Sequence, residues 1–258
     1  MKKAILVVSF GTTYIETRKK TIEALENMVR EKYGNDYSVH RVFTSNLVRK
    51  RIKENEGLDI YDMGQAFEAM RNEGIEEVYI SSLHIIAGHE YHKIIEAMRQ
   101  YKNDFRVMRL ARPLLYSTED YREVVAAMAE VESLQAGEAL FCMGHGSDHS
   151  ANAGYIMLRH FLEKDDRTKD MYIGTVEGYP ELEDLFEEIE STSYKKIKLL
   201  PFMVVAGDHA TNDMASEEED SWKSLIEAKG YQTECILKGL GEFSEFRKIF
   251  LRRLEAIL

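Results

Sequence analysis

Cysteine, proline and flexible linkers are scarce in this chain. Of its 258 residues, only two are cysteine and three are proline. Cys142 and Cys235 both lie in apolar, strand-like runs, which indicates buried thiols and argues against a disulfide or a pair of metal ligands. No Ser/Gly-rich stretch interrupts the sequence, so we expect the parts of the chain to be packed together.

A membrane span and an excess of positive charge are also absent. No apolar run approaches the length of a bilayer span, and the run after Met1-Lys2-Lys3 is too short for a signal peptide. The formal net charge is −11 at pH 7, which argues against nucleic acid or an anionic membrane as the main partner. We therefore expect a soluble, cytoplasmic protein.

Common nucleotide-binding and nucleophile motifs are missing as well. No strand candidate is followed by Gly-x-Ser-x-Gly, a phosphate-loop lysine motif or Gly-x-Gly-x-x-Gly. The pair of glycines in Gly239-Leu240-Gly241 is isolated and is a weak signal. Nothing in the sequence requires ATP or NAD.

One short pattern occurs twice. Residues 83–90 (LHIIAGHE) and 202–209 (FMVVAGDH) each follow a hydrophobic run and lead into a helix-like stretch. Their shared core of two apolar residues, Ala and Gly places Glu90 and His209 at equivalent positions. A carboxylate in one copy and an imidazole in the other indicate metal or proton chemistry at a site between two similar halves.

A fainter similarity joins the stretches that open the two halves. Residues 4–12 and 139–147 both run from an apolar segment into a glycine-containing loop, and their alignment pairs Phe10 with His145. We therefore expect a duplicated unit whose two copies differ by insertions.

Short β-branched apolar runs alternate with amphipathic segments along the chain. Continuously apolar strands are typical of sheets with helices on both faces, and this alternation indicates parallel strands. The sequence predicts an α/β protein with two similar three-layer α/β half-domains, parallel sheets and a cleft between the halves. The expected strands are 3–9, 37–43, 76–83, 105–110, 138–143, 171–176, 196–204 and 231–237.

The amphipathic segments predict helices, with Ser45, Ser117 and Ser244 as candidate N-caps. We expect the halves to be 1–134 and 135–258, and the sequence leaves open whether the last helix crosses back to the first half. The expected helices lie near 16–32, 46–55, 62–73, 91–101, 118–132, 149–163, 181–190, 214–229 and 243–257.

Candidate site residues fall at the carboxyl ends of the expected strands, where parallel sheets bind ligands. Among the eight histidines, His145 stands between two glycines directly after a strand, a setting in which backbone and ligand approach closely. The repeat supports His209 and Glu90. Such ligands suit Co²⁺, Ni²⁺, Zn²⁺ and Fe²⁺, and ligand type alone does not choose between them. His40 and His160 are interpreted as structural.

The run His89-Glu90-Tyr91-His92 is similar to a zinc-protease motif but fails it, because Lys93 stands where the second histidine belongs. A pair of histidines three apart at a helix start predicts a second ion site or, alternatively, an exposed helix start.

Two basic clusters, 18–20 and 49–53, stand out in an acidic chain. They predict either a solvated helix face or contacts with an anionic substrate.

Taken together, the motifs resemble the anaerobic sirohydrochlorin cobaltochelatases (the CbiK family), which are ATP-independent type II chelatases. The resemblance runs nearly end to end and is most specific in its long C-terminal segments. It is carried by residues 2–12, 82–86 with Gly88, Glu90 and Tyr91, and by 143–146, 177–180, 205–216, 220–223 and 239–242.

The resemblance implies two α/β halves with a tetrapyrrole cleft, and cobalt bound by His145, His209 and Glu90. His89 departs from it, because we expect a carboxylate at that position. The residues expected to contact the tetrapyrrole are Ser9, Phe10, Gly11, Thr12, His84, Gly207 and Arg49.

The function predicted in this way is insertion of Co²⁺ into sirohydrochlorin or its reduced precursor precorrin-2 in cobalamin biosynthesis. Either Glu90 or a neutral imidazole takes up the released pyrrole protons. The alternatives are an iron or nickel tetrapyrrole chelatase of the sirohaem type, and a tetrapyrrole- or metal-binding carrier without turnover. Homo-oligomerisation is compatible with the sequence.

Overall fold

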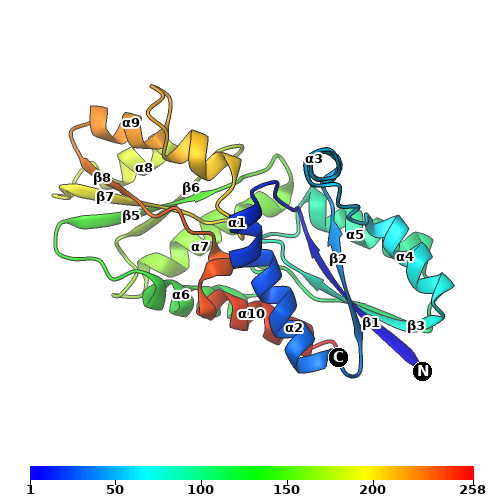
Figure 1. Ribbon diagram of the computed structural model, residues 1–258. Helices are drawn as coiled ribbons and strands as arrows, with labels where there is room; N and C mark the ends of the chain where they lie inside the picture. The colour runs from blue at the N-terminus through cyan, green and yellow to red at the C-terminus, as the bar shows by residue number, and fades with distance from the viewer. The chain divides into compact units, whose positions relative to one another are not determined.

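The computed structural model describes the whole chain, Met1 to Leu258, and contains two compact units. The first unit is 1–114 with 247–258, and the second is 115–246. All eight expected strands are present (Figure 1). They are β1 (Lys2–Ser9), β2 (Ser38–Phe43), β3 (Ile75–Ser82), β4 (Val107–Leu110), β5 (Glu138–Gly144), β6 (Met171–Thr175), β7 (Lys196–Pro201) and β8 (Gln232–Cys235).

Helices alternate with these strands, and none is long and apolar enough to cross a membrane. The α-helices are α1 (Ile15–Arg18), α2 (Ala24–Tyr33), α3 (Asn46–Glu56), α4 (Met63–Asn72), α5 (His89–Gln100), α6 (Thr118–Val131), α7 (Ala153–Glu163), α8 (Leu182–Ile189), α9 (Trp222–Ala228) and α10 (Ser244–Glu255). Four short turns complete them: the π-helical η1 (Lys19–Glu23) and η3 (Ala210–Met214), and the 3₁₀ turns η2 (Ser150–Asn152) and η4 (Leu240–Glu242).

Each unit holds one four-stranded parallel sheet, and the two sheets have the same strand order. The order is β2-β1-β3-β4 in the first and β6-β5-β7-β8 in the second. The repeated pattern follows β3 in one copy and β7 in the other, which are equivalent strands. The predicted α/β fold with two parallel sheets is confirmed, and its topology supports the inferred duplication.

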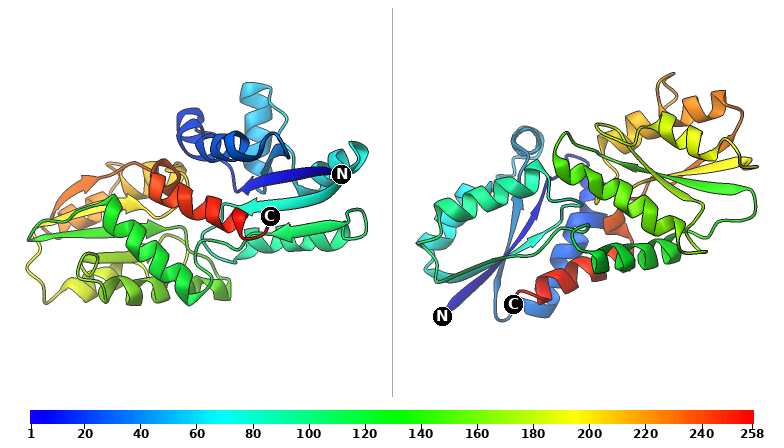
Figure 2. Two further views of the ribbon diagram at one scale, coloured as in Figure 1. Left: turned by 90° about the horizontal axis from the view of Figure 1, so that it is seen from below. Right: turned by 180° about the vertical axis from the view of Figure 1, so that it is seen from behind.

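In the first unit, the alternation of side chains along β1 feeds two apolar layers. Ala4, Leu6 and Val8 join a buried cluster with side chains of α4 and α5, so the intervening Ile5 and Val7 point to the opposite face. On that opposite side α10 runs beside α2 (Figure 2), and Tyr33 of α2 donates a hydrogen bond to Glu255 of α10.

In the second unit, β5 is buried on both faces in the same way. Phe141 and Met143 pack with α8, η3 and α9 in one apolar cluster. On α6 and α7, Tyr121 stacks on Phe161 with ring centroids 5.7 Å apart. The central strands β1 and β5, which lead into the loops of Phe10 and His145, are therefore buried on both faces.

The division between the units differs from the expected one at residue 134. It lies at residue 114, because α6 packs by the Tyr121–Phe161 stack on α7 and so belongs with the second sheet. The last helix, from Arg247 on, belongs with the first unit, which was one of the two arrangements that the sequence left open.

Two further expectations need correction. The helix expected at 214–229 is absent as one piece: η3 ends at Met214, and α9 begins only after Ser221, whose hydroxyl caps the Ser224 N–H and donates to the Ser216 carbonyl. Cys142 is buried as expected, but Cys235 is only half-buried, because it ends the edge strand β8.

The capping expectations hold at Ser45, whose hydroxyl accepts from the Val48 N–H, and at Ser117, which forms a capping box with Asp120. Ser244 is the first residue of α10.

Candidate metal centre

Three side chains of the second unit form a cluster that suits a metal ion. His145, Glu177 and His209 each offer a ligand atom, and these atoms all lie within 4.8 Å of one another. The two imidazole rings stand edge to face with centroids 4.7 Å apart. Glu177 Oε2 lies 3.8 Å from His145 Nδ1. Two imidazoles and one carboxylate are a donor set that binds borderline divalent ions.

The strand order brings His145 and Glu177 together. Both residues follow the ends of neighbouring strands, β5 and β6, and the Glu177 N–H donates to the His145 carbonyl at 2.7 Å. Gly146 has a φ of 84°, and a Cβ there would lie 2.7 Å from the Gly178 nitrogen. A side chain at Gly146 would therefore push the Glu177 loop away from His145.

Asn152 fastens these two loops to each other. Its side chain donates to the Tyr179 carbonyl at 2.6 Å and accepts from the Ser147 N–H at 3.0 Å. Gly178 lies so close that a Cβ would be 2.8 Å from the Asn152 amide oxygen. These local contacts thus keep the His145 loop and the Glu177 loop next to each other.

The third candidate ligand, His209, is held by a different loop. It immediately precedes η3, and its Nδ1 lies 2.8 Å from Asp213 Oδ2. The isolated Gly-x-Gly pair supports the preceding stretch: the Leu240 N–H donates to the Met203 carbonyl, and a Cβ at Gly239 would lie 2.4 Å from the Val204 carbonyl oxygen. The weak signal at 239–241 is therefore a support for the loop that carries His209.

The cluster is accessible from solvent. The side chains of His145, Glu177 and His209 are 43%, 59% and 29% exposed. His145 Nδ1 donates to the Gly146 carbonyl at 3.0 Å, so each imidazole keeps Nε2 for an ion. Three side chains that bound an ion here would leave a coordination position open, as catalytic metal sites do.

The first unit carries different residues at the equivalent positions. The Ser45 N–H donates to the Phe10 carbonyl at 3.3 Å, as Glu177 does to His145, and the repeat matches Glu90 with His209. Phe10, Ser45 and Glu90 therefore stand at the positions that the candidate ligands occupy in the second unit. Phe10 is 47% exposed, which gives this unit an apolar surface in place of an imidazole.

Glu90 lies in the first turn of α5 and is half-buried. Burial raises the pKa of its carboxyl, but the hydrogen bonds from Lys93 and Thr44 and the nearby positive charge of Lys93 together outweigh burial and hold that pKa below its usual value. Glu90 is thus a carboxylate at neutral pH.

His84 lies just after β3 and is buried. Burial lowers the pKa of this imidazole to about 4, so it is neutral at pH 7. Its Nδ1 lies 2.9 Å from the Ser82 hydroxyl, and its Nε2 has no hydrogen-bond partner.

The remaining loop residues shape the strand ends. Ser9 is buried. Gly11 has a φ of 98°, and a Cβ at this residue would lie 2.5 Å from the Phe43 ring. The Thr12 hydroxyl accepts from the Tyr14 N–H, and the Gly207 carbonyl accepts from Thr211 in the first turn of η3.

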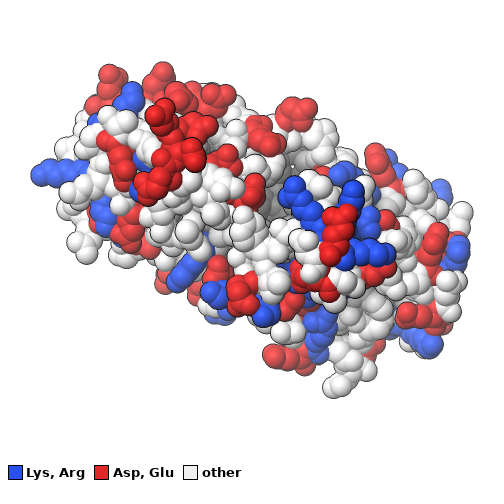
Figure 3. Space-filling model, turned by 45° about the horizontal axis from the view of Figure 1, so that its top comes forward, with Lys and Arg blue, Asp and Glu red and all other residues white.

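Arg49 is engaged within the protein. Its guanidinium donates to Asp62 at 3.0 Å, and also to Asn46, Gln65 and the Ile60 carbonyl. Lys50 and Arg51 on the same helix are exposed. Figure 3 shows the basic side chains gathered over α3, with acidic ones among them.

His89 and His92 lie on the exposed first turn of α5, and His92 Nδ1 donates to the Gly88 carbonyl at 3.0 Å. Their role as a second ion site stays a prediction.

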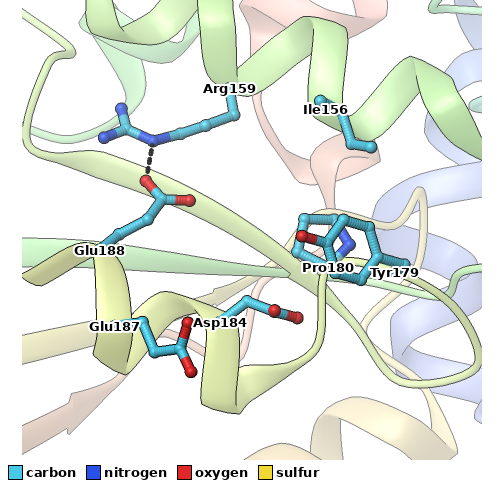
Figure 4. Close-up of a pocket in the computed structure, with 7 residues that line it drawn as sticks. All are labelled: Ile156, Arg159, Tyr179, Pro180, Asp184, Glu187 and Glu188. Atoms are coloured by element: carbon cyan, nitrogen blue, oxygen red, sulfur yellow. Dashed lines mark hydrogen bonds and ion pairs between the residues drawn. The ribbon is translucent and has the colours of Figure 1, made fainter.

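A separate shallow hollow of about 390 Å³ lies in the second unit. Figure 4 shows it between α7, α8 and the loop after β6, with Arg159 donating to Glu188 at 2.7 Å. It is lined by Ile156, Arg159, Tyr179, Pro180, Asp184, Glu187 and Glu188. It shares a loop with the cluster but none of the three ligands.

Glu177 is the candidate ligand that the reasoning from sequence missed. The residue falls in a segment that carried the family resemblance, and it directly follows the expected strand 171–176 and precedes a glycine. This placement after a strand and beside a glycine could have identified Glu177, since the same placement had identified His145.

Known proteins of similar sequence are cobalt chelatases. A model of the cobalt chelatase (CbiK) family matches residues 3–258. The chain is 38% identical over 259 residues to the sirohydrochlorin cobaltochelatase of Salmonella typhimurium, covering 100% of this chain and 97% of that protein. It is 32% identical over 266 residues to the sirohydrochlorin cobaltochelatase CbiKC of Nitratidesulfovibrio vulgaris, covering 99% and 90%.

Among solved structures, SirB from Bacillus subtilis with Fe³⁺ shares the fold, with a TM-score of 0.64 at 16% identity, covering 100% of this chain and 96% of that one. Because the family match spans nearly the whole chain, and two cobaltochelatases are more than 30% identical over nearly their full length, this protein belongs to the cobalt chelatase (CbiK) family.

Proposed function

We propose that this protein inserts Co²⁺ into sirohydrochlorin in the cytoplasm, without ATP or a nicotinamide cofactor. Family membership and the names of two relatives support the proposal. The observation that carries it is the cluster of His145, Glu177 and His209, whose ligand atoms lie within 4.8 Å of one another.

In this proposal the cluster delivers the ion. The three side chains hold Co²⁺ by two imidazole nitrogens and one carboxylate, and the open coordination positions face the incoming macrocycle. As the ring nitrogens bind the ion, they replace the protein ligands. The ring loses two N–H protons, so the reaction consumes Co²⁺ and releases two protons.

A base must take up those protons. We propose Glu90 for this role, because its carboxyl is ionised at neutral pH and so has a lone pair that can accept a proton. A role as a cobalt ligand is the alternative for the same carboxylate. Glu90→Gln keeps the side-chain shape and removes the charge, so we expect a large loss of insertion rate with a smaller loss of sirohydrochlorin binding.

The substrate is strongly anionic, since sirohydrochlorin carries eight carboxylates. The exposed cations of α3, Lys50 and Arg51, are the proposed contacts. Arg49 was predicted from sequence for this role. Its four acceptors within the protein support a structural role for it, so the exposed pair is the better test.

The deciding experiment is insertion of Co²⁺, Fe²⁺ and Ni²⁺ into sirohydrochlorin, measured side by side under anaerobic conditions with the tetrapyrrole in excess over protein. We expect many turnovers and the highest rate with Co²⁺. One equivalent of product per chain would identify a carrier instead, and a highest rate with Fe²⁺ or Ni²⁺ would identify a different chelatase.

A further inference from the structure

Asp213 makes a contact that bears directly on the ligand His209. Its Oδ2 lies 2.8 Å from His209 Nδ1, and the two residues are four apart across the π-helical turn η3. A carboxylate only accepts hydrogen bonds, so Nδ1 carries the hydrogen and Nε2 keeps its lone pair.

We propose that Asp213 is a positioning residue that fixes the tautomer and orientation of the His209 ring for the metal ion. The inference rests on the proposed function, because it takes His209 as a ligand of the substrate ion. A carboxylate that accepts the Nδ1–H also makes Nε2 a stronger electron-pair donor to the metal ion. Loss of such a partner typically lowers metal affinity by about 10- to 100-fold.

The two histidines of the cluster differ in this respect. His145 donates its Nδ1–H to a neutral backbone carbonyl, that of Gly146, whereas His209 has a charged partner. The ligand His209 is therefore held by a side chain that mutation can remove, while the orientation of His145 depends on the backbone.

The surrounding turn keeps Asp213 in place. Thr211 donates from both its backbone N–H and its hydroxyl to the Gly207 carbonyl, and Asn212 donates to Asp208. These bonds close the turn by contacts that do not use the Asp213 carboxylate, so replacing Asp213 should leave the turn formed.

The test is calorimetric titration of Co²⁺ alone into the full-length, metal-free protein, followed by the absorption spectrum of the bound ion. Asp213→Ala should weaken binding by about 10- to 100-fold and alter the spectrum. Asp213→Asn should lose less, because its amide oxygen still accepts the Nδ1–H. The matched control is Glu217→Gln, which removes the same charge from an exposed side chain (86% exposed) a few residues further on and should bind Co²⁺ like the wild type.

Binding by Asp213→Asn and Asp213→Ala within about twofold of the wild type, with His209→Ala strongly impaired, would overturn the inference. A lower melting temperature of either metal-free variant with unchanged Co²⁺ affinity would do the same, since it would show a structural role only. The titration uses no tetrapyrrole. Its result on Asp213 can therefore be interpreted even if the protein does not catalyse Co²⁺ insertion. Wild-type binding by His209→Ala would instead remove the metal site on which both proposals depend.

Discussion

The three proposed ligands are loop residues that contribute little to the core. His145, Glu177 and His209 each lie beyond a strand end and remain partly exposed. Their positions are set by neighbouring backbone and by glycines. Their side chains are therefore not needed for packing and are available to bind an ion.

The first prediction follows from that placement. His145→Ala and His209→Ala should each abolish most Co²⁺ insertion, and Glu177→Gln should weaken Co²⁺ binding. The free energy of unfolding in urea should change by less than about 1 kcal/mol, as is usual for substitutions of exposed loop residues. His160→Ala, at an exposed histidine of α7, is the control. Near-normal turnover in both histidine variants would contradict the assignment.

The second prediction concerns His84 and pH. The pKa of this buried imidazole is about 4 in the folded protein, against 6.5 as its ordinary value. The unfolded chain therefore binds the proton more readily, so the stability due to neutral His84 is present above pH 6.5 and is lost as the pH falls toward 4.

From these values, His84 should account for a loss of about 2 kcal/mol between pH 7 and pH 5. Urea denaturation of the wild type and His84→Asn at both pH values measures it. The variant should be less stable at pH 7 but less sensitive to pH. Equal sensitivity in the two proteins would show that His84 is not responsible.

Among the elements, the loops after β5 and β6 act as one piece. The strands are neighbours, Gly146 lets the two backbones touch, and Asn152 bonds to both loops. The basic residues of helix α3 differ in their surroundings. Arg49 forms hydrogen bonds within the protein, whereas Lys50 and Arg51 are exposed to solvent.

The third prediction tests the contact between these loops. Gly146→Ala should weaken Co²⁺ binding and destabilise the protein, because the left-handed φ strains an alanine and its Cβ would overlap the Glu177–Gly178 backbone. We expect a loss of more than about 1 kcal/mol in thermal or urea unfolding. Gly137→Ala has a similar φ of 83° with nothing within 4 Å of its Cβ, so it should show the strain without the loss of metal affinity.

The fourth prediction concerns α3. Replacing Lys50 and Arg51 together by Gln should weaken sirohydrochlorin binding, more at low than at high ionic strength, because salt screens exposed charges. The double variant Arg99→Gln, Lys102→Gln removes two exposed charges elsewhere in the first unit and is the control. If the α3 variant binds sirohydrochlorin at low salt as tightly as the wild type, these cations do not contact the substrate and only face solvent.

The whole molecule is a duplication with unequal halves. The two sheets share one topology, yet His145, Glu177 and His209 are matched by Phe10, Ser45 and Glu90 in the first unit. One copy therefore has the full donor set and the other retains a single carboxylate.

The fifth prediction follows from this asymmetry. Calorimetry should give one Co²⁺ per chain, bound by the second unit. Replacing His89 and His92 by Asn should leave this stoichiometry unchanged. Two ions in the wild type and one in that variant would assign a second site to the start of α5.

Local pattern in the sequence determined the elements and much of the site. Apolar periodicity located all eight strands, because burial on a sheet acts residue by residue, and the repeat marked Glu90 and His209. Glycines on both sides of His145 identified that loop, since the conformations they permit are a local property.

Only the tertiary structure decided the rest. Glu177 joins the cluster because β6 pairs with β5, a contact between distant parts of the chain. The division at residue 114 depends on α6 packing through Tyr121 on Phe161. Arg49, which the sequence offered as a contact for the tetrapyrrole, donates a hydrogen bond to Asp62 in the folded chain. Each of these outcomes depends on which surfaces meet after folding, and a pattern along one segment does not contain that information.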